Sequence, residues 1–390
     1  MSSSALPLPA AAAARLPYID ALRGVACLWV ILHHSVIFWF WGPRPGAGRI
    51  EALAVKTART SSAIGWLGVN LFIVLSGFCL LYPLVRANPI REVKLQLRPF
   101  LRRRSWRILP PYYAALALFA AVAAFSAPPV ALAKDLARHV VLVHNLSYRT
   151  ISTINGSFWS LALEFQLYLV FPILVVVAAR RGLAAAVGLT FCVSVATQAA
   201  VAMLCRPHDW ASAAVWYYSL PAQWFTFGAG MVAAVLVARP SRDYYRPAIA
   251  AACCAGALGL LLLARAGQFG MVRDQLFAVA FAALIVALSR HGAAAAWNGR
   301  ALRSVIWVGG ISYSLYLIHQ PVVHYTGTLV DRVTGNGEIR LAIFLLAALP
   351  CLIATGYVFH LAFERPFLKA RASGQRSVPP AVASANEVLC

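Results

Sequence analysis

Ten long apolar runs constrain this chain more than any other feature of its sequence. They cover approximately residues 19–41, 65–85, 108–128, 158–179, 183–204, 213–238, 248–264, 274–289, 304–329 and 341–362. A helix of about 20 apolar residues is long enough to cross the hydrocarbon core of a bilayer. Only helices and closed barrels satisfy their backbone in lipid, and none of the runs alternates like a barrel strand. The predicted fold is therefore an all-α polytopic membrane protein, with about ten transmembrane helices in one bundle.

The composition agrees with a membrane protein and argues against a nucleic-acid-binding one. Only 12% of the residues are charged, whereas soluble domains approach a quarter. The formal net charge is +22, but the basic residues lie mainly in short loops between the apolar runs, so we expect no nucleic-acid partner. The eight cysteines lie mostly inside the apolar runs and form no CxxC pair. We therefore expect neither a disulfide framework nor a metal site.

The distribution of Lys and Arg predicts the orientation of the chain in the membrane. If the N-terminus is cytoplasmic, the cytoplasmic segments hold 21 of the 34 basic residues and the opposite loops hold 12. The segment 86–107 alone holds eight of them. Both termini are therefore predicted to be cytoplasmic. We expect a flexible N-terminus over 1–17, a transmembrane domain over 18–368 in contact with membrane lipid, and a flexible tail over 369–390; the oligomeric state stays open.

Four ionisable residues inside the apolar runs are candidates for function, because such groups are costly in lipid. Arg23 and His34 are eleven residues apart, which places them on one face of a helix and roughly 16 Å apart along its axis. The same helical rise, counted from the expected helix ends, places His34, His319 and Glu164 at one level in the outer half of the membrane. Structural alternatives stay open: Arg23 as a snorkelling anchor, Glu164 as a hydrogen-bond acceptor, and His319 as a helix-packing residue.

Several stretches of the chain carry a resemblance to a known family. They are YIDALRGVACLWVILHHS (18–35), GVNLFIVLSGFCL (68–80), LRRRSWRILPPYY (101–113), FWSLALEFQLYLVFP (158–172), ISYSLYLIHQPVV (311–323) and FERPF (363–367). In this order they resemble the bacterial membrane acyltransferase-3 family of integral-membrane O-acyltransferases, whose first helix carries Arg or Lys, ten residues and then His. Phe165 is a departure, because the family often has a second Glu at that position.

The resemblance implies an enzyme that moves an acyl group, usually acetyl from acetyl-CoA, from the cytoplasm to a hydroxyl on the far side of the membrane or within it. On this basis we expect His34 to act as general base or transient acyl carrier, with Glu164 orienting it or receiving its proton. The donor would be bound by Arg23 with Arg102, Arg103 and Arg104. Weaker candidates for substrate binding are Asn70, Ser76, Tyr168 and His319.

The acceptor and the class of function are not fixed by the sequence. The expected acceptor is a carbohydrate, free or lipid-linked, such as exopolysaccharide, lipopolysaccharide or peptidoglycan, with a small macrolide-like compound as the alternative. The expected location is the bacterial cytoplasmic (inner) membrane. Two other classes stay open: a transporter or exporter of glycan precursors, which would also use buried His and Glu, and a purely structural membrane scaffold.

Overall fold

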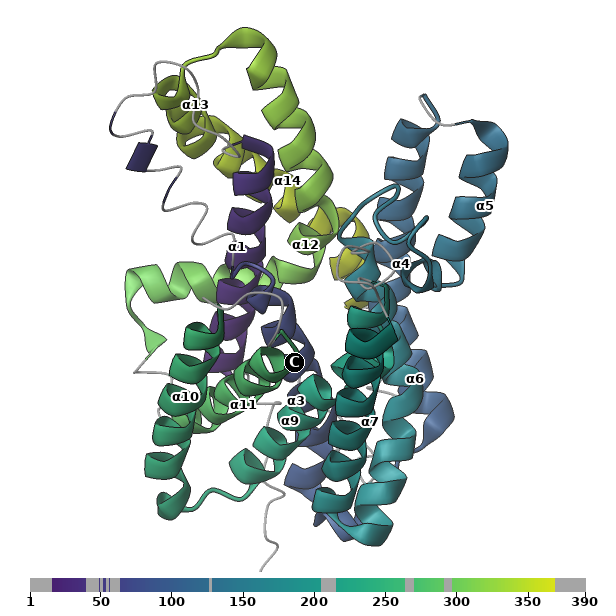
Figure 1. Cartoon of the computed structure of the whole chain (residues 1–390), viewed down its shortest axis with the longest axis vertical. Helices are drawn as coiled ribbons and strands as arrows, with labels where there is room; N and C mark the ends of the chain where they lie inside the picture. Colours follow the sequence, from purple (N-terminus) through teal and green to yellow (C-terminus); the bar gives the residue numbers. More distant parts are fainter. Residues whose placement is uncertain are drawn as a thin grey trace, which may run out of the picture.

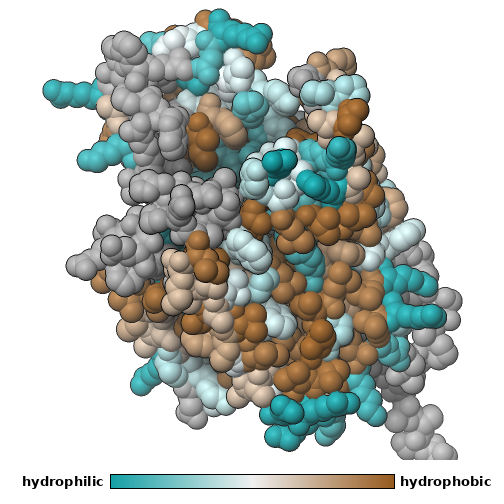
Figure 2. Space-filling view, turned by 45° about the vertical axis from the view of Figure 1, so that its right-hand side comes forward, coloured by the Kyte–Doolittle hydropathy of each residue, from teal (hydrophilic) through white to brown (hydrophobic). Residues whose placement is uncertain are grey.

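The protein is an all-helical bundle (Figure 1). The computed structural model describes residues 16–39, 64–125, 128–204, 215–263, 270–290 and 297–368, together with positions 49, 52, 53 and 56. Within these residues, ten helices are long and apolar enough to cross a membrane. Figure 2 shows a broad hydrophobic area over the middle of one face, with hydrophilic residues gathered above and below it. This pattern confirms the predicted fold class, a polytopic helical membrane protein.

The helix bounds follow the predicted apolar runs with three main differences. The helices are α1 (Pro17–Trp39), α3 (Leu67–Ala87), α4 (Leu97–Ala123), α5 (Pro129–Val140), α6 (Phe158–Arg181), α7 (Leu183–Leu204), α9 (Leu220–Ala238), α10 (Arg242–Leu263), α11 (Gly270–Ser289), α12 (Arg300–Val333), α13 (Gly337–Ile343) and α14 (Leu349–Phe359). Short 3-10 turns lie at Ile90–Glu92 and His144–Leu146, and π-helical turns at Phe344–Ala348 and His360–Glu364. Helix α4 begins well before residue 108, α12 extends beyond its predicted run at both ends, and α5 was not predicted.

The terminal segments predicted to be flexible lie outside the described residues, except for Leu16 and Pro17.

The early start of α4 has a consequence for the site. The prolines Pro110 and Pro111 lie inside the helix, and the basic stretch that precedes them is helical as well. Its arginines therefore project from α4 into the bundle and around it, and do not lie in an irregular loop.

Glycines allow the helices that carry the candidate residues to pack closely. A Cβ atom on Gly24 of α1 would collide with the backbone carbonyl of Val305 in α12, and one on Gly309 with that of Asp20. The same close approach joins α3 and α9, where a Cβ on Gly230 would meet the carbonyl of Val74. Small residues at helix crossings in this way let membrane helices approach backbone to backbone. The α1–α12 contact brings the helix of Arg23 and His34 against the helix of His319.

The segment before α6 folds into the bundle and does not run along its outer end. The amide Nδ2 of Asn155 donates to the backbone carbonyl of Leu317 at 2.8 Å, and the Ser157 hydroxyl donates to Gln320 Oε1 at 2.7 Å. Both acceptors belong to α12 and flank His319. Helix α6 therefore begins at the level of His319, below the end of the bundle where its apolar run was expected to start.

Candidate functional site

A cavity lies between helices α1, α3, α4, α6 and α12. Its unfilled space, the mouth included, is about 840 Å³. Three guanidinium groups contribute to its wall: Arg23 from α1 and the pair Arg104 and Arg107 from α4. The lining also includes the hydroxyl groups of Ser160 and Tyr316, and the rest of the wall is mostly apolar, with Val69, Phe72, Ile73, Leu80, Ile108, Leu161 and Leu167. The cavity thus combines cationic groups from α1 and α4 with a mostly apolar wall.

Glu164 is the acidic group among the residues that line this cavity. Its oxygen Oε1 accepts hydrogen bonds from the Ser76 hydroxyl at 2.9 Å and from the Tyr168 hydroxyl at 2.6 Å. The guanidinium carbon of Arg104 lies 5.8 Å from the centre of the Tyr168 ring. With three guanidinium groups and one carboxylate, the lining has an excess of positive charge, and such a site favours an anionic ligand.

His34 and His319 meet beside the Tyr316 end of the cavity. His319 Nε2 lies 3.1 Å from His34 Nδ1, and the ring centroids are 4.9 Å apart. His319 is fully buried, with 0% of its surface exposed, and its ring centre is 5.1 Å from that of Tyr316. The His34 side chain therefore points into the bundle. Tyr316 lies between the cavity and the histidine pair, and its hydroxyl is 2.6 Å from that of Ser160.

The structure brings most of the predicted residues together, in two adjoining groups. His34 and His319 lie at one level, as the helical rise predicted. Both His34 and Arg23 face α12, since the cavity beside Arg23 is also lined by Ser312 and Tyr316. Of the other predicted residues, Ser76, Arg104, Glu164 and Tyr168 line the cavity, whereas Asn70, Arg102 and Arg103 are not among its lining residues. The catalytic and binding roles of all these residues stay predictions.

Glu164 is where the geometry differs from the sequence prediction. It was expected at the level of His34, but it lies in the cavity with Arg23 and bonds to Ser76 and Tyr168. The cause is the inward fold of the segment before α6. Because α6 begins at the level of His319, the six helical steps from Phe158 to Glu164 carry the carboxylate about 9 Å further along the axis.

Arg107, Ser160 and Tyr316 line the cavity and were not identified from the sequence. Helical spacing was the signal that could have found them, because each lies three or four residues from a candidate: Arg107 from Arg104, Ser160 from Glu164 and Tyr316 from His319. For Arg107 this signal required knowing that the basic stretch is helical.

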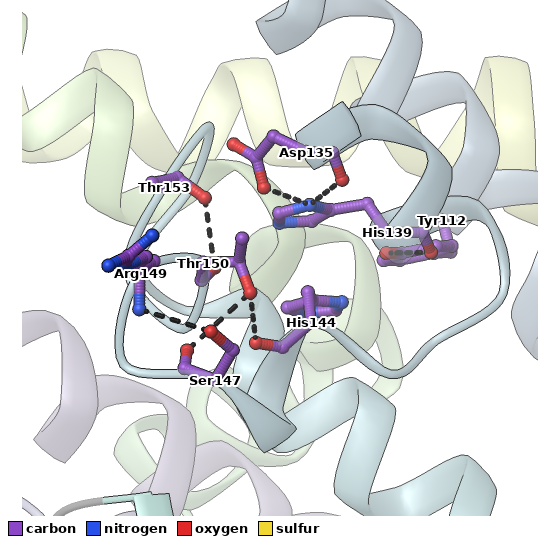
Figure 3. A network of polar contacts seen from close by, with 8 residues as sticks. All are labelled: Tyr112, Asp135, His139, His144, Ser147, Arg149, Thr150 and Thr153. Carbon is purple, nitrogen blue, oxygen red and sulfur yellow. Dashed lines mark hydrogen bonds and ion pairs between the residues drawn. The ribbon is translucent and has the colours of Figure 1, made fainter. Parts of the chain in front are cut away.

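A second polar cluster lies outside the predicted spans, where α5 and the following turn cover the start of α6 (Figure 3). The rings of His139 and His144 stack, with centroids 3.9 Å apart and planes 6° from parallel. His139 Nδ1 is 3.0 Å from the backbone oxygen of Asp135 and 3.1 Å from its carboxylate. The Tyr112 hydroxyl of α4 donates to the His139 carbonyl at 2.9 Å. The Tyr112 bond thus fastens the end of α5 to α4, and the stacked histidines join α5 to the turn that follows it.

Acid should loosen this cluster. Burial, followed by the neighbouring His139, lowers the pKa of His144 from 6.5 to about 3. Burial also lowers the pKa of His139, against the opposing effect of Asp135. The unfolded segment therefore binds protons that the folded one does not, so stability is retained above about pH 6.5 and lost as the pH falls, by up to about 1.4 kcal/mol per pH unit for each histidine.

Hydrogen–deuterium exchange at pH 7.5 and pH 5.0, corrected for the intrinsic exchange rate, measures this effect. We expect the amides of residues 129–157 to exchange faster at pH 5.0, while those of α3 change little. His144→Gln is the matched variant, and it should reduce the difference between the two pH values. Equal protection of residues 129–157 at both pH values would contradict the expectation.

Residues 16–360 match the family described as "Acyltransferase domain". The peptidoglycan O-acetyltransferase OatA of Listeria monocytogenes is 24% identical over 344 residues, which cover 82% of this chain and 51% of that protein. The O-acetyltransferase OatA of Staphylococcus aureus is 23% identical over 363 residues, 86% of this chain and 54% of that protein.

A third relative is the putative peptidoglycan O-acetyltransferase YrhL of Bacillus subtilis, 25% identical over 369 residues, which cover 87% of this chain and 53% of that protein. The chain therefore spans about half the length of the curated relatives it matches. No solved structure matches it significantly.

Proposed function

The chain belongs to the membrane acyltransferase-3 family, whose domain matches residues 16–360, and on this premise we propose that it transfers an acetyl group from acetyl-CoA to a hydroxyl of a cell-envelope carbohydrate. The observation that carries the proposal is the cavity itself. Its lining combines three arginines with mostly apolar side chains, and Tyr316 in its wall contacts His319 of the pair His34–His319. This arrangement suits a donor with an anionic head and a thioester at the end of a long arm.

The donor binds with its phosphates at Arg23, Arg104 and Arg107. Guanidinium groups bind phosphate through paired, charge-assisted hydrogen bonds, and a partly desolvated site strengthens these bonds. The excess of basic residues in 86–107 favours a cytoplasmic position for this part of the cavity, which is where acetyl-CoA is made. The axial distance from Arg23 to His34 is about 16 Å, comparable with an extended pantetheine arm.

His34 acts as the general base. Its imidazole takes the proton of the acceptor hydroxyl as the hydroxyl oxygen attacks the thioester carbonyl carbon. The C–S bond then breaks, and the proton passes from the imidazolium to the departing thiolate, so that CoA leaves as the thiol and the acceptor carries the ester. Imidazole suits both steps, because its usual pKa lies close to neutral pH.

In this proposal Glu164 belongs to the donor-binding part of the site and is not the hydrogen-bond partner of the base, His34. Its carboxylate accepts hydrogen bonds from the hydroxyls of Ser76 and Tyr168, and the Ser76 bond joins α3 to α6 beside the cavity.

The acceptor is most simply peptidoglycan, because relatives in two genera are named as acting, or putatively acting, on peptidoglycan. These relatives are bacterial, which favours the bacterial cytoplasmic membrane as the location.

Mass spectrometry of cell-envelope glycans tests the proposal. Muropeptides, exopolysaccharide and lipid-linked glycans should be compared between the native strain, a deletion strain and the deletion strain complemented with the chain. We expect the deletion to remove one acetyl increment per modified site from one of these glycans, and complementation to restore it. A glycan that is lost from the surface but keeps its acetyl groups would instead identify an exporter, and an unchanged envelope would contradict acetylation of a glycan.

A further inference from the structure

A chain of hydrogen bonds links the backbone of α12 to His34 through His319. His319 Nδ1 lies 2.6 Å from the backbone oxygen of Tyr316, and His319 Nε2 lies 3.1 Å from His34 Nδ1. His34 Nδ1 also lies 3.0 Å from the backbone oxygen of Val30. Two of the three acceptors are therefore carbonyl oxygens, which cannot donate.

These carbonyls determine where each hydrogen is. The Tyr316 oxygen requires a hydrogen on His319 Nδ1, so neutral His319 has its lone pair on Nε2. The hydroxyl of Ser157 is 3.5 Å from that nitrogen, but it donates to Gln320 Oε1 at 2.7 Å. His319 Nε2 is therefore left to accept from His34 Nδ1. The Val30 carbonyl requires the same hydrogen on His34, so neutral His34 has its free lone pair on Nε2.

We propose that His319 is a positioning residue: through its Nε2 it holds the hydrogen of His34 on Nδ1 and turns His34 Nε2 toward the substrates as the base. This assignment rests on the proposed function, and it differs from the substrate-binding role that the sequence suggested for His319. Serine-hydrolase triads use a carboxylate in this place to select the tautomer and orientation of the base. Here a neutral imidazole, anchored by a backbone carbonyl, does the same work inside the bundle.

The neutral partner suits a site within a membrane. A carboxylate beside His34 would carry a charge into a desolvated environment, which is costly. A neutral imidazole selects the same tautomer without that charge. When His34 takes the hydroxyl proton on Nε2, its Nδ1–H bond to His319 becomes charge-assisted and strengthens. His319 therefore favours the transition state over the resting state without touching either substrate.

Three substitutions at His319 separate positioning from packing. Gln places an amide oxygen close to where Nε2 was, so it still accepts from His34. Asn is shorter and keeps only the contact with the Tyr316 carbonyl, while Leu keeps volume and no polar group. Full-length variants in lipid nanodiscs are assayed with acetyl-CoA and purified glycan acceptor. We expect Asn and Leu to lower kcat about 100-fold, Gln less than about tenfold, and the donor KM to stay within about threefold throughout.

A packing role would instead make Leu the mildest replacement, or Asn and Gln equal, and either result overturns the proposal. A wild-type protein that transfers no acetyl group to any glycan contradicts the proposed function, and a second measurement then still tests His319. Nitrogen-15 NMR of histidine-labelled protein at pH 7.5, with the His34 signals identified by their loss in His34→Gln, should show hydrogen on Nδ1 and a bare Nε2, and His319→Leu should weaken this preference. The opposite tautomer of His34 in wild type, or an unchanged tautomer preference in His319→Leu, overturns the proposal by itself.

Discussion

His34→Ala will reduce acetyl transfer by about 10³- to 10⁴-fold and leave donor binding nearly unchanged. The large effect follows because His34 is the base in the proposed reaction, and its neighbour His319 is held by the Tyr316 carbonyl and cannot take over that role. General-base catalysis commonly contributes 10²–10⁴-fold, and loss of the base also removes the route by which the thiolate is protonated. Donor binding is spared because His34 is not among the residues that line the cavity.

The measurement needs both quantities from one preparation. Initial rates with labelled acetyl-CoA give transfer, and calorimetry with CoA gives donor affinity, which should stay within about threefold of wild type. His33→Ala is the matched control, since it truncates the same side chain one residue away on α1; its ring meets that of His34 edge-on, with centroids 5.1 Å apart. Transfer at near-normal rates in His34→Ala, or an equal loss in His33→Ala, would argue against a base at position 34.

The shared level of His34 and His319 was predictable because it depends on the regular geometry of each helix alone. Rise and twist per residue are fixed in an α-helix, so the relative depth and facing of groups can be counted along each span. Arg23 and His34 therefore lie on one face of α1, as expected, and in the structure this face meets α12. What the count could not supply was the approach of the two helices, which depends on glycines at positions such as Gly24 and Gly309.

Glu164 and Arg107 show where such counting ends. Both errors come from the N-terminal ends of helices: α6 begins at the predicted residue but at a different depth, and α4 begins earlier than predicted. The start of α6 is set by Asn155 and Ser157, whose side chains bond to α12 from a segment with no apolar periodicity. The start of α4 lies eleven residues before its apolar run, in a stretch whose charge favours a loop. Contacts with other parts of the fold determine where both helices begin in the bundle, and such contacts cannot be read from helix propensity or hydropathy along the chain.

The basic stretch of α4 gives the second large prediction. Arg107→Ala should raise the KM for acetyl-CoA about 10- to 100-fold, because hydrogen bonds to charged groups contribute roughly 1.5–3 kcal/mol and each 1.4 kcal/mol is a factor of ten. The KM of Arg107→Lys should lie between those of wild type and Arg107→Ala, since lysine keeps the positive charge but cannot form the paired hydrogen bonds of a guanidinium group. Arg102→Ala is the matched control: Arg102 belongs to the same stretch, is exposed and does not line the cavity, so its effect should stay within about twofold.

A shortened donor distinguishes binding of phosphate from a general disturbance of α4. Acetyl-pantetheine has the thioester and the arm but none of the phosphates of acetyl-CoA. Wild type should use it poorly, and Arg107→Ala should use it no worse than wild type does, because the group that the guanidinium binds is already missing. The two losses would then fail to add, as they do when one interaction is removed from either side. If they add instead, Arg107 stabilises the helix and the phosphates lie elsewhere in the protein.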